Sequence, residues 1–156
     1  MRLFILLELF SLICNAFIMD DIMHLKEKSR NNIECALFLV QEQFFCSSVH
    51  CSYYSCIQYI KHLLLNKFDL TEDDIENLRK GKEGDEIKRV GLHDALHRYM
   101  RSKINPESKK IFDREFYALK KARVDADYLN ISIGEKTAKE AARRAEGFLE
   151  LLKKVG

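Results

Sequence analysis

The stretch that decides the fold runs from Cys46 to Lys67 and reads CSSVHCSYYSCIQYIKHLLLNK. Its apolar and aromatic side chains recur at steps of three and four residues, the spacing that places side chains on one face of an α-helix. They are Val49, Tyr53, Cys56, Ile57, Ile60, Leu63 and Leu64. Because the stripe is wide and contains aromatic rings, we predict that this helix is the central and most buried one.

The sequence on either side of this stretch also predicts helices. Before it, residues 20–42 keep a helical spacing of apolar positions. After it, Thr71 and Asp74 have the S/T-x-x-D pattern that begins a helix, here a short one that ends near residue 80. Residues 81–86, GKEGDE, combine two glycines with a charged run and therefore predict a loop.

The second half of the chain predicts three more helices. The face of the first comprises Val90, His93, Leu96, His97, Tyr99 and Met100. Asn105 and Pro106 have the pattern of an N-cap followed by proline at the first helical position, so a helix is expected over 106–130. Its predicted buried face comprises Ile111, Phe112, Phe116, Leu119, Ala122 and Ala126. Ser132 and Glu135 predict a capping box that begins the last helix, 135–154.

Composition favours a single helical domain. The chain has 156 residues, enough to bury one core, and its one proline and six glycines leave few breaks for the many turns of a β-sandwich. We therefore predict an all-α, antiparallel bundle of four to five main helices over residues 19–156. The formal net charge of +2 is too small to require a nucleic-acid partner.

The cysteines and the motifs bear on cofactors. The five cysteines form no C-x-x-C pair and no Cys/His pair at zinc-finger spacing, so no metal site is expected from them. Four of them, Cys35, Cys46, Cys51 and Cys56, are expected to be buried free thiols in a reducing compartment, which indicates the cytoplasm. The chain lacks the P-loop, dinucleotide, zinc-protease and serine-hydrolase motifs, and no cofactor is predicted.

Residues 1–18 form a separate apolar segment with three interpretations. Leu3 to Cys14 is an apolar run after Arg2, as in the core of a signal peptide. Glu8 interrupts it and about a dozen apolar residues are too few to span a bilayer, so no membrane association is expected. The segment is an over-long start ahead of Met19, an additional packed helix, or a signal-like extension for export or anchoring.

Two histidines and one arginine-containing segment are the candidate functional residues. His93 and His97 stand four residues apart on one helix face, a spacing that suits core packing, a polar groove or a metal. Arg123 and Asp127 are also one helical turn apart, and Tyr128 adds a hydroxyl beside them. These residues are either an exposed ion pair or part of a polar groove, because an acid and an arginine do not belong in an apolar core.

Three pieces of the sequence resemble the HEPN superfamily, small helical bundles of prokaryotic toxin–antitoxin and defence modules. The first is ECALFLVQEQFFCSSVHCSYYSCIQY at 34–59, with its Tyr53–Tyr54 pair. The second is GLHDAL at 91–96, where Leu92 departs from the small polar residue that precedes His in many relatives. The third is RVDADY at 123–128, followed by ARRAEGFL at 142–149, which matches R-x-x-x-D-Y and A-x-x-F-[LI]. The resemblance covers about residues 20–155.

The resemblance implies a bundle that is often dimeric across the groove where the arginine lies. In ribonuclease members that groove holds Arg, four to six residues, then His, and no Arg in this chain is followed by His at that interval. Tyr128 stands where the histidine would follow Arg123, and neither Tyr nor Arg moves a proton readily near neutral pH.

The leading hypothesis is a non-catalytic HEPN-like module, part of a two-gene system. It would bind a cognate protein, such as a minimal nucleotidyltransferase, or the phosphate of a nucleotide or RNA. Arg123 would contact the anion, together with Asp127, Tyr128 and His93. One alternative is a metal-independent ribonuclease that uses His93 and Arg123. The other is a purely structural bundle whose groove only forms a homodimer.

The role of residues 1–18 is open to a direct test. If they are not structural, a chain that begins at Met19 should stay soluble and melt within about 4 °C of the full-length protein, because no core contact is removed. Thermal unfolding followed by circular dichroism checks this. Loss of folding on that truncation would show that the segment is a core helix.

Overall fold

The computed structural model describes residues 24–80 and 90–155, and in these ranges the protein consists of helices and connecting turns, with no β-strand. The predictions for residues 1–18 and 81–86 lie outside the described residues. Residues 24–41 form what we term the N-terminal helix, and the helices that follow are α2 (Phe45–Asn66), α3 (Glu72–Asn77), α4 (Leu92–Lys103), α5 (Pro106–Tyr128) and α6 (Glu135–Lys153). The predicted all-α bundle is confirmed. No helix of the described chain combines the length and apolarity needed to cross a membrane.

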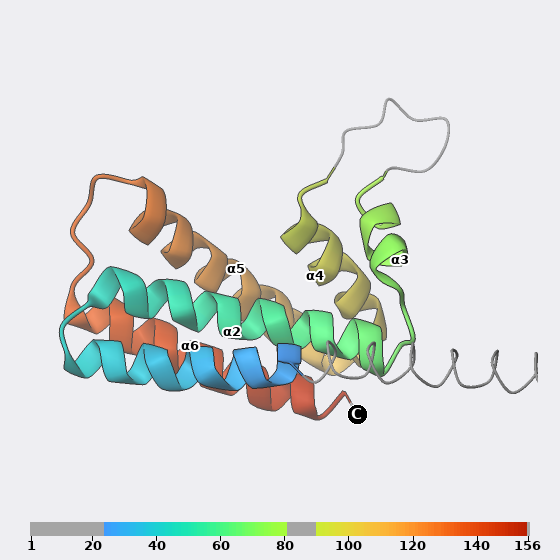
Figure 1. The fold of residues 1–156 in the computed structure, drawn as a ribbon, viewed down its shortest axis with the longest axis horizontal. Helices are drawn as coiled ribbons and strands as arrows, with labels where there is room; N and C mark the ends of the chain where they lie inside the picture. Colours follow the sequence, from blue (N-terminus) through green and yellow to red (C-terminus); the bar gives the residue numbers. More distant parts are fainter. Residues whose placement is uncertain (1–23, 81–89, 156) are drawn as a thin grey trace, which may run out of the picture.

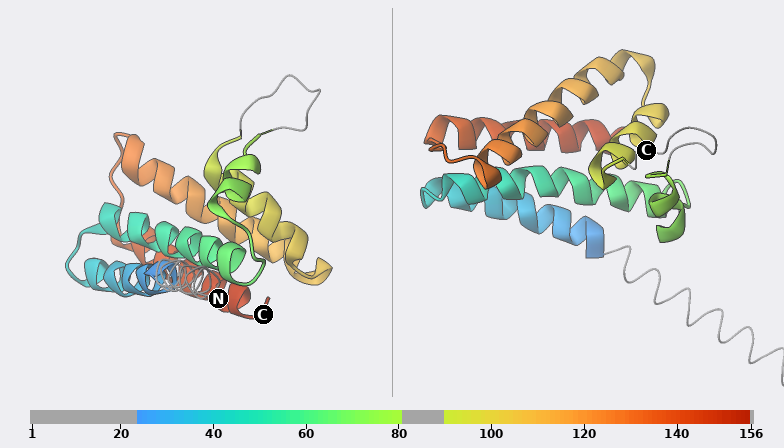
Figure 2. Two further views of the ribbon diagram at one scale, coloured as in Figure 1. Left: turned by 45° about the vertical axis from the view of Figure 1, so that its right-hand side comes forward. Right: turned by 90° about the horizontal axis from the view of Figure 1, so that it is seen from above.

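The bundle is built from two helical hairpins that pack on each other (Figure 1). The N-terminal helix and α2 are joined by the turn at 42–44, and α5 and α6 by the loop at 129–134. The N-terminal helix and α5 run opposite to α2 and α6, while α3 and α4 lie near the C-terminal end of α2 (Figures 1 and 2). Gln43 takes the left-handed conformation, with φ of 64°, and this reverses the chain after the N-terminal helix.

Helix α2 is the central helix, as predicted. It packs against the N-terminal helix, α4, α5 and α6, so most of its length is enclosed (Figure 2). All of its predicted core side chains are buried, namely Val49, Tyr53, Cys56, Ile57, Ile60, Leu63 and Leu64. Each large apolar side chain that leaves water in this way contributes about 1.5–3 kcal/mol to the free energy of folding.

Serines allow the N-terminal helix to approach α2 closely. Ser48 Oγ donates to the carbonyl oxygen of Ala36 at 2.8 Å, and Ser29 Oγ donates to that of Ser55 at 2.7 Å. Both hydroxyls are buried, and a buried hydroxyl without a partner would be destabilising by about 1–3 kcal/mol. The two bonds therefore tie the helices together without large side chains between them.

Alanines allow α6 to approach α2 closely. The buried face of α6 comprises Ala138, Ala141, Ala142, Ala145, Phe148, Leu149 and Leu152. The two backbones come close enough for Cys56 Sγ to lie 3.8 Å from the carbonyl oxygen of Ala145. Small side chains on α6 thus let α2 lie close to it, while Phe148 and Leu152 fill the core beyond.

Two of the three predicted helix caps are present. Thr71 and Asp74 form the predicted capping box, and Asn105 accepts a hydrogen bond from the Ser108 amide at 2.8 Å, as expected of an N-cap. The capping box predicted from Ser132 is wrong, because Gly134 occupies the N-cap of α6 and makes no side-chain cap. Helix α5 ends at Tyr128, two residues before its predicted end.

Two further expectations about burial are wrong. Ile111 is exposed, because the buried face of α5 runs through Phe112 and Phe116, and a neighbouring position is turned by about 100° from it. Of the four described cysteines only Cys56 is buried, while Cys35 and Cys46 are exposed on the outer sides of their helices and Cys51 is half-buried.

One histidine belongs to the core. His97 is enclosed by three aromatic rings, with centroid distances of 5.0 Å to Phe112, 4.3 Å to Phe116 and 4.9 Å to Tyr117. Its Nε2 lies 3.0 Å from Asp113 Oδ1, out of line for a hydrogen bond, so neither ring nitrogen is hydrogen-bonded within the described residues. Burial lowers the pKa of His97 below its ordinary value, and the charge of Asp113 only partly opposes this.

The protein should therefore lose stability as the pH falls from 7 to 5. His97 binds a proton more readily in the unfolded chain than in the folded one, so protonation favours unfolding below the ordinary histidine pKa. His97→Gln should reduce the difference between the free energies of unfolding in urea at pH 7 and pH 5. His24→Gln, on the exposed face of the N-terminal helix, is the control. An unchanged pH difference in His97→Gln would contradict this account.

Candidate functional site

The polar residues predicted from the sequence meet where the early turns of α2 face the last turns of α5 (Figure 1). We refer to His50, Tyr54, Arg123, Asp127 and Tyr128 as the Arg123 cluster. The first two residues come from α2 and the other three from α5. The hairpin arrangement creates this meeting point, because α5 runs antiparallel to α2 and brings its C-terminal end to the N-terminal part of α2.

Arg123 is held on three sides. Its Nη2 donates to Tyr54 Oη at 2.9 Å and to Tyr128 Oη at 3.1 Å, and the guanidinium lies over both rings at 5.4 and 4.8 Å. Its Nε lies 2.7 Å from Asp127 Oδ2, although the buried N–H is not aligned for a hydrogen bond. The side chains of Arg123 and Asp127 are only 16% and 19% exposed, so this ion pair is partly buried rather than a solvated surface pair.

The contacts of Arg123 leave several donors unused. No described residue accepts a hydrogen bond from its Nη1, so two N–H groups remain available. Each tyrosine hydroxyl accepts from Nη2, which leaves the hydrogen of Tyr54 and of Tyr128 free to donate within the described structure. Burial opposes the positive charge, but the hydrogen bond to Tyr128 and the nearby Asp127 raise the pKa of Arg123 above its ordinary value.

Asp127 also contacts a histidine that was not predicted from the sequence. His50 Nδ1 lies 3.0 Å from Asp127 Oδ2 and 3.2 Å from Oδ1, and its ring is 4.5 Å from the ring of Tyr54. The sequence contains one signal for it, because His50 stands four residues before Tyr54 and therefore shares its helix face. Its link to Asp127 crosses 77 positions of sequence, which no spacing rule reveals.

His93 lies behind this cluster. Its Nδ1 is 2.9 Å from the hydroxyl oxygen of Tyr53, and its ring meets that of Tyr54 edge-on at 5.7 Å. Burial lowers the pKa of His93, and the charges of Arg123 and Lys120 lower it further. The structure thus brings all four predicted residues into one region, with His93 uncharged at neutral pH and engaged by Tyr53.

The two histidines of α4 do not converge on a metal. His93 contacts Tyr53, whereas His97 lies among the aromatic rings of the core. Among the described residues no group of three or more His, Cys, Asp or Glu side chains is placed to hold a metal ion. The sequence left core packing, a polar site or a metal site open for these histidines. His97 packs in the core, and His93 lies next to the Arg123 cluster.

The basic residues of α5 are largely neutralised by nearby acids. Arg114 pairs with Glu115, Lys121 with Asp125 and Arg123 with Asp127, all within α5, while Lys120 pairs with Asp94 of α4. A continuous basic track for a nucleic-acid backbone is therefore not formed by these four residues. Any anion contact on this helix is a local one.

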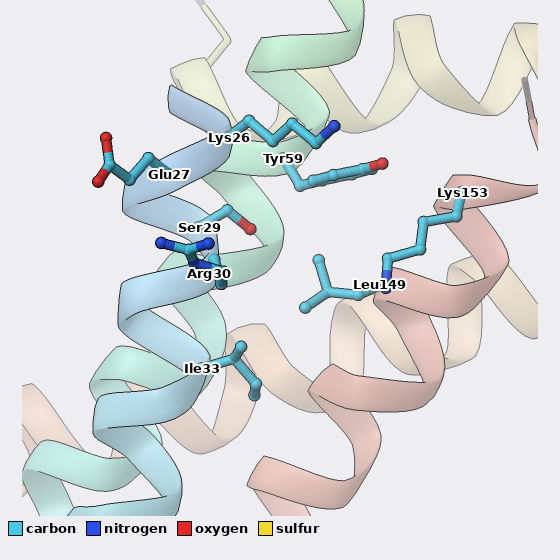
Figure 3. Close-up of a pocket in the computed structure, with 8 residues that line it drawn as sticks. All are labelled: Lys26, Glu27, Ser29, Arg30, Ile33, Tyr59, Leu149 and Lys153. Atoms are coloured by element: carbon cyan, nitrogen blue, oxygen red, sulfur yellow. The ribbon is translucent and has the colours of Figure 1, made fainter. Parts of the chain in front are cut away.

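A pocket of the described chain lies away from this cluster. It has a volume of about 560 Å³ and lies between the N-terminal helix, α2 and α6 (Figure 3). Its lining residues are Lys26, Glu27, Ser29, Arg30, Ile33, Tyr59, Leu149 and Lys153. None belongs to the Arg123 cluster, so the polar groove and this pocket are separate features.

Comparison with known proteins gives no relative. No protein-family model matches the chain, and neither the curated proteins nor the solved structures contain a match. The resemblance to the HEPN superfamily therefore depends on the sequence motifs alone, and function is inferred from the groove.

Proposed function

We propose that the protein is a non-catalytic HEPN-like module that binds the phosphate of a nucleotide or RNA at the Arg123 cluster. The observation that carries this proposal is the set of unused hydrogen-bond donors around Arg123. They are the two N–H groups of Arg123 Nη1 and the hydroxyl hydrogens of Tyr54 and Tyr128. A phosphate offers only acceptors and therefore complements such a set.

The aromatic rings support a nucleotide rather than a bare phosphate. Tyr128 is 67% exposed and lies against the guanidinium of Arg123, and His50 is about half exposed beside Tyr54. Exposed rings beside an arginine are the platforms on which unpaired bases stack. Because Arg114, Lys120 and Lys121 of α5 are paired with carboxylates, the proposal is a contact with one or two phosphates.

His93 supports the non-catalytic part of the proposal. An enzyme that transfers the proton of a ribose hydroxyl needs a base within reach of it and an acid for the leaving group. Burial lowers the pKa of His93 and so disfavours the imidazolium that would act as the acid near pH 7, and Tyr53 engages Nδ1. The competing ribonuclease hypothesis would require His93 to leave this contact.

Binding should depend on Arg123 and only weakly on salt. Octauridylate labelled with tetramethylrhodamine should bind the wild type, and Arg123→Gln should weaken binding about tenfold or more, because it removes a charged donor set. The slope of log K against log [salt] should be about −0.7 to −1.4, as for one or two phosphates on a single strand. Fluorescence anisotropy measures both.

Arg30→Gln is a matched control for that substitution. Arg30 also pairs with a carboxylate one helical turn away, Glu34, but on the exposed N-terminal helix. The Arg30→Gln variant should bind the labelled octauridylate as the wild type does. The same RNA should remain intact for hours with and without divalent metal. Cleavage that disappears in both His93→Ala and Arg123→Ala would contradict the proposal and establish the ribonuclease.

A second candidate, a protein partner, is favoured by exposed apolar side chains in the turn at 42–44 and the loop at 129–134. These two segments lie at the same end of the bundle (Figure 1). Phe44 precedes α2, while Leu129 and Ile131 follow Tyr128, and all are more than half exposed. Patches of this kind with Tyr and Arg are common in protein interfaces. The partner would be a cognate protein of a two-gene cytoplasmic system, such as a minimal nucleotidyltransferase.

We further propose that the protein forms a symmetric dimer, as HEPN-like bundles commonly do. The sequence has more aromatic side chains than one small core needs, namely Phe44, Phe45, Tyr53, Tyr54, Phe112, Phe116 and Tyr117. Of these, Tyr53, Phe112 and Phe116 are buried inside one copy. Phe44 and Tyr117 remain exposed and are available to an interface. Light scattering at tens of micromolar should give twice 18.3 kDa, whereas a mass of 18.3 kDa would contradict the dimer.

A further inference from the structure

The charges of the Arg123 cluster cancel when its histidine is neutral. Asp127 Oδ2 lies 2.7 Å from Arg123 Nε and 3.0 Å from His50 Nδ1, so one carboxylate serves two cationic partners. Arg123 contributes one positive charge and Asp127 one negative charge. An approaching phosphate therefore meets donors without a net positive charge until His50 takes up a proton.

The contact with Asp127 also fixes the tautomer of His50. A carboxylate accepts hydrogen bonds, so Nδ1 carries the hydrogen in this contact, and Nε2 is the atom that gains or loses the proton. No described residue bonds Nε2, and the side chain is 47% exposed. The imidazole packs against Tyr54, whose hydroxyl contacts Arg123, so both side chains belong to one continuous surface.

The other charged groups around His50 do not take over this role. On α5 they are Asp127, Arg123 and the hydroxyl of Tyr128, and on α2 the neighbouring ring is Tyr54. On α4, His93 lies behind Tyr54, while Asp94 is paired with Lys120 of α5. Among the described residues of this surface, His50 is thus the titratable side chain that is exposed and whose Nε2 makes no hydrogen bond.

We propose that His50 is a second phosphate contact of this site, held in position by Asp127, and that ligand binding is coupled to uptake of one proton at His50 Nε2. This inference rests on the proposed function and specifies its ligand contact. Protonation gives the cluster a net positive charge and one further N–H donor beside Arg123. In return, a bound phosphate favours the protonated imidazole, because linkage between the two is reciprocal. Asp127 is a positioning residue that orients both cations.

The test is the pH dependence of RNA affinity. Octauridylate labelled with tetramethylrhodamine, whose emission does not change in this range, is titrated with the full-length protein at pH 6, 7 and 8. The affinity of the wild type should rise as the pH falls, by up to about tenfold per pH unit for uptake of one proton. His50→Gln keeps a donor but cannot titrate, so its affinity should be nearly constant and equal to that of the wild type at pH 8.

His24→Gln is the matched control, since His24 also lies near a carboxylate, Glu27, but on the N-terminal helix. It should keep the pH dependence of the wild type. A second measurement uses the imidazole NMR signal of His50 in the wild type, which should titrate at higher pH when the RNA is present. A purely structural role of His50 would not produce that shift.

The outcomes separate this inference from the proposed function. If His50→Gln keeps the pH dependence of the wild type while Arg123→Gln loses binding, the role of His50 is wrong and the phosphate site stands. If the NMR titration of His50 is unmoved by saturating RNA, the coupling is likewise overturned. If RNA binds neither the wild type nor any variant between pH 6 and 8, both the proposed phosphate site and the proposed role of His50 are wrong.

Discussion

The close packing of α2 against its neighbours is the constraint on which the rest of the structure depends. A helix enclosed by the N-terminal helix, α4, α5 and α6 cannot carry large side chains on every face. Serine hydroxyls on α2 therefore bond carbonyl groups directly, and alanines on α6 face its other side. On the side towards α4 and α5 larger side chains fit, and there Tyr53 meets Phe116.

That division of α2 also determines where a polar site can form. Tyr53 points into the core, whereas its neighbour Tyr54 is turned by about 100° and reaches the groove beside α5. Arg123 can be kept there with little exposure because two hydroxyls and a carboxylate surround it. At the Arg123 cluster the aromatic side of α2 reaches the surface. This explains why tyrosine rings and charged side chains occur together there.

Much of this could be predicted from the sequence, for local reasons. Periodicity located the helices and the central role of α2, and the caps at Thr71 and Asn105 depend on residues three positions apart. The relation of Arg123, Asp127 and Tyr128 is similarly local, whereas the contact of His50 with Asp127 requires the tertiary fold. The start of α6 at Glu135 was predicted, but its cap was not, because Gly134 occupies the N-cap and makes no side-chain bond, and the exposure of Ile111 depends on which face of α5 packs against the bundle.

The hydroxyl-bonded contact of the N-terminal helix has a consequence for motion. Within the described part of that helix only Ser29 and Ala36 are fully buried, Ile33 and Val40 are partly buried against the core, and side-chain hydrogen bonds such as Asn32 to Gln58 complete the contact with α2. Little apolar surface is exposed when such an element separates, so its opening free energy lies well below that of the whole domain. The N-terminal helix is then a separate cooperative unit, whose amide hydrogens exchange with solvent while α2, α5 and α6 remain folded.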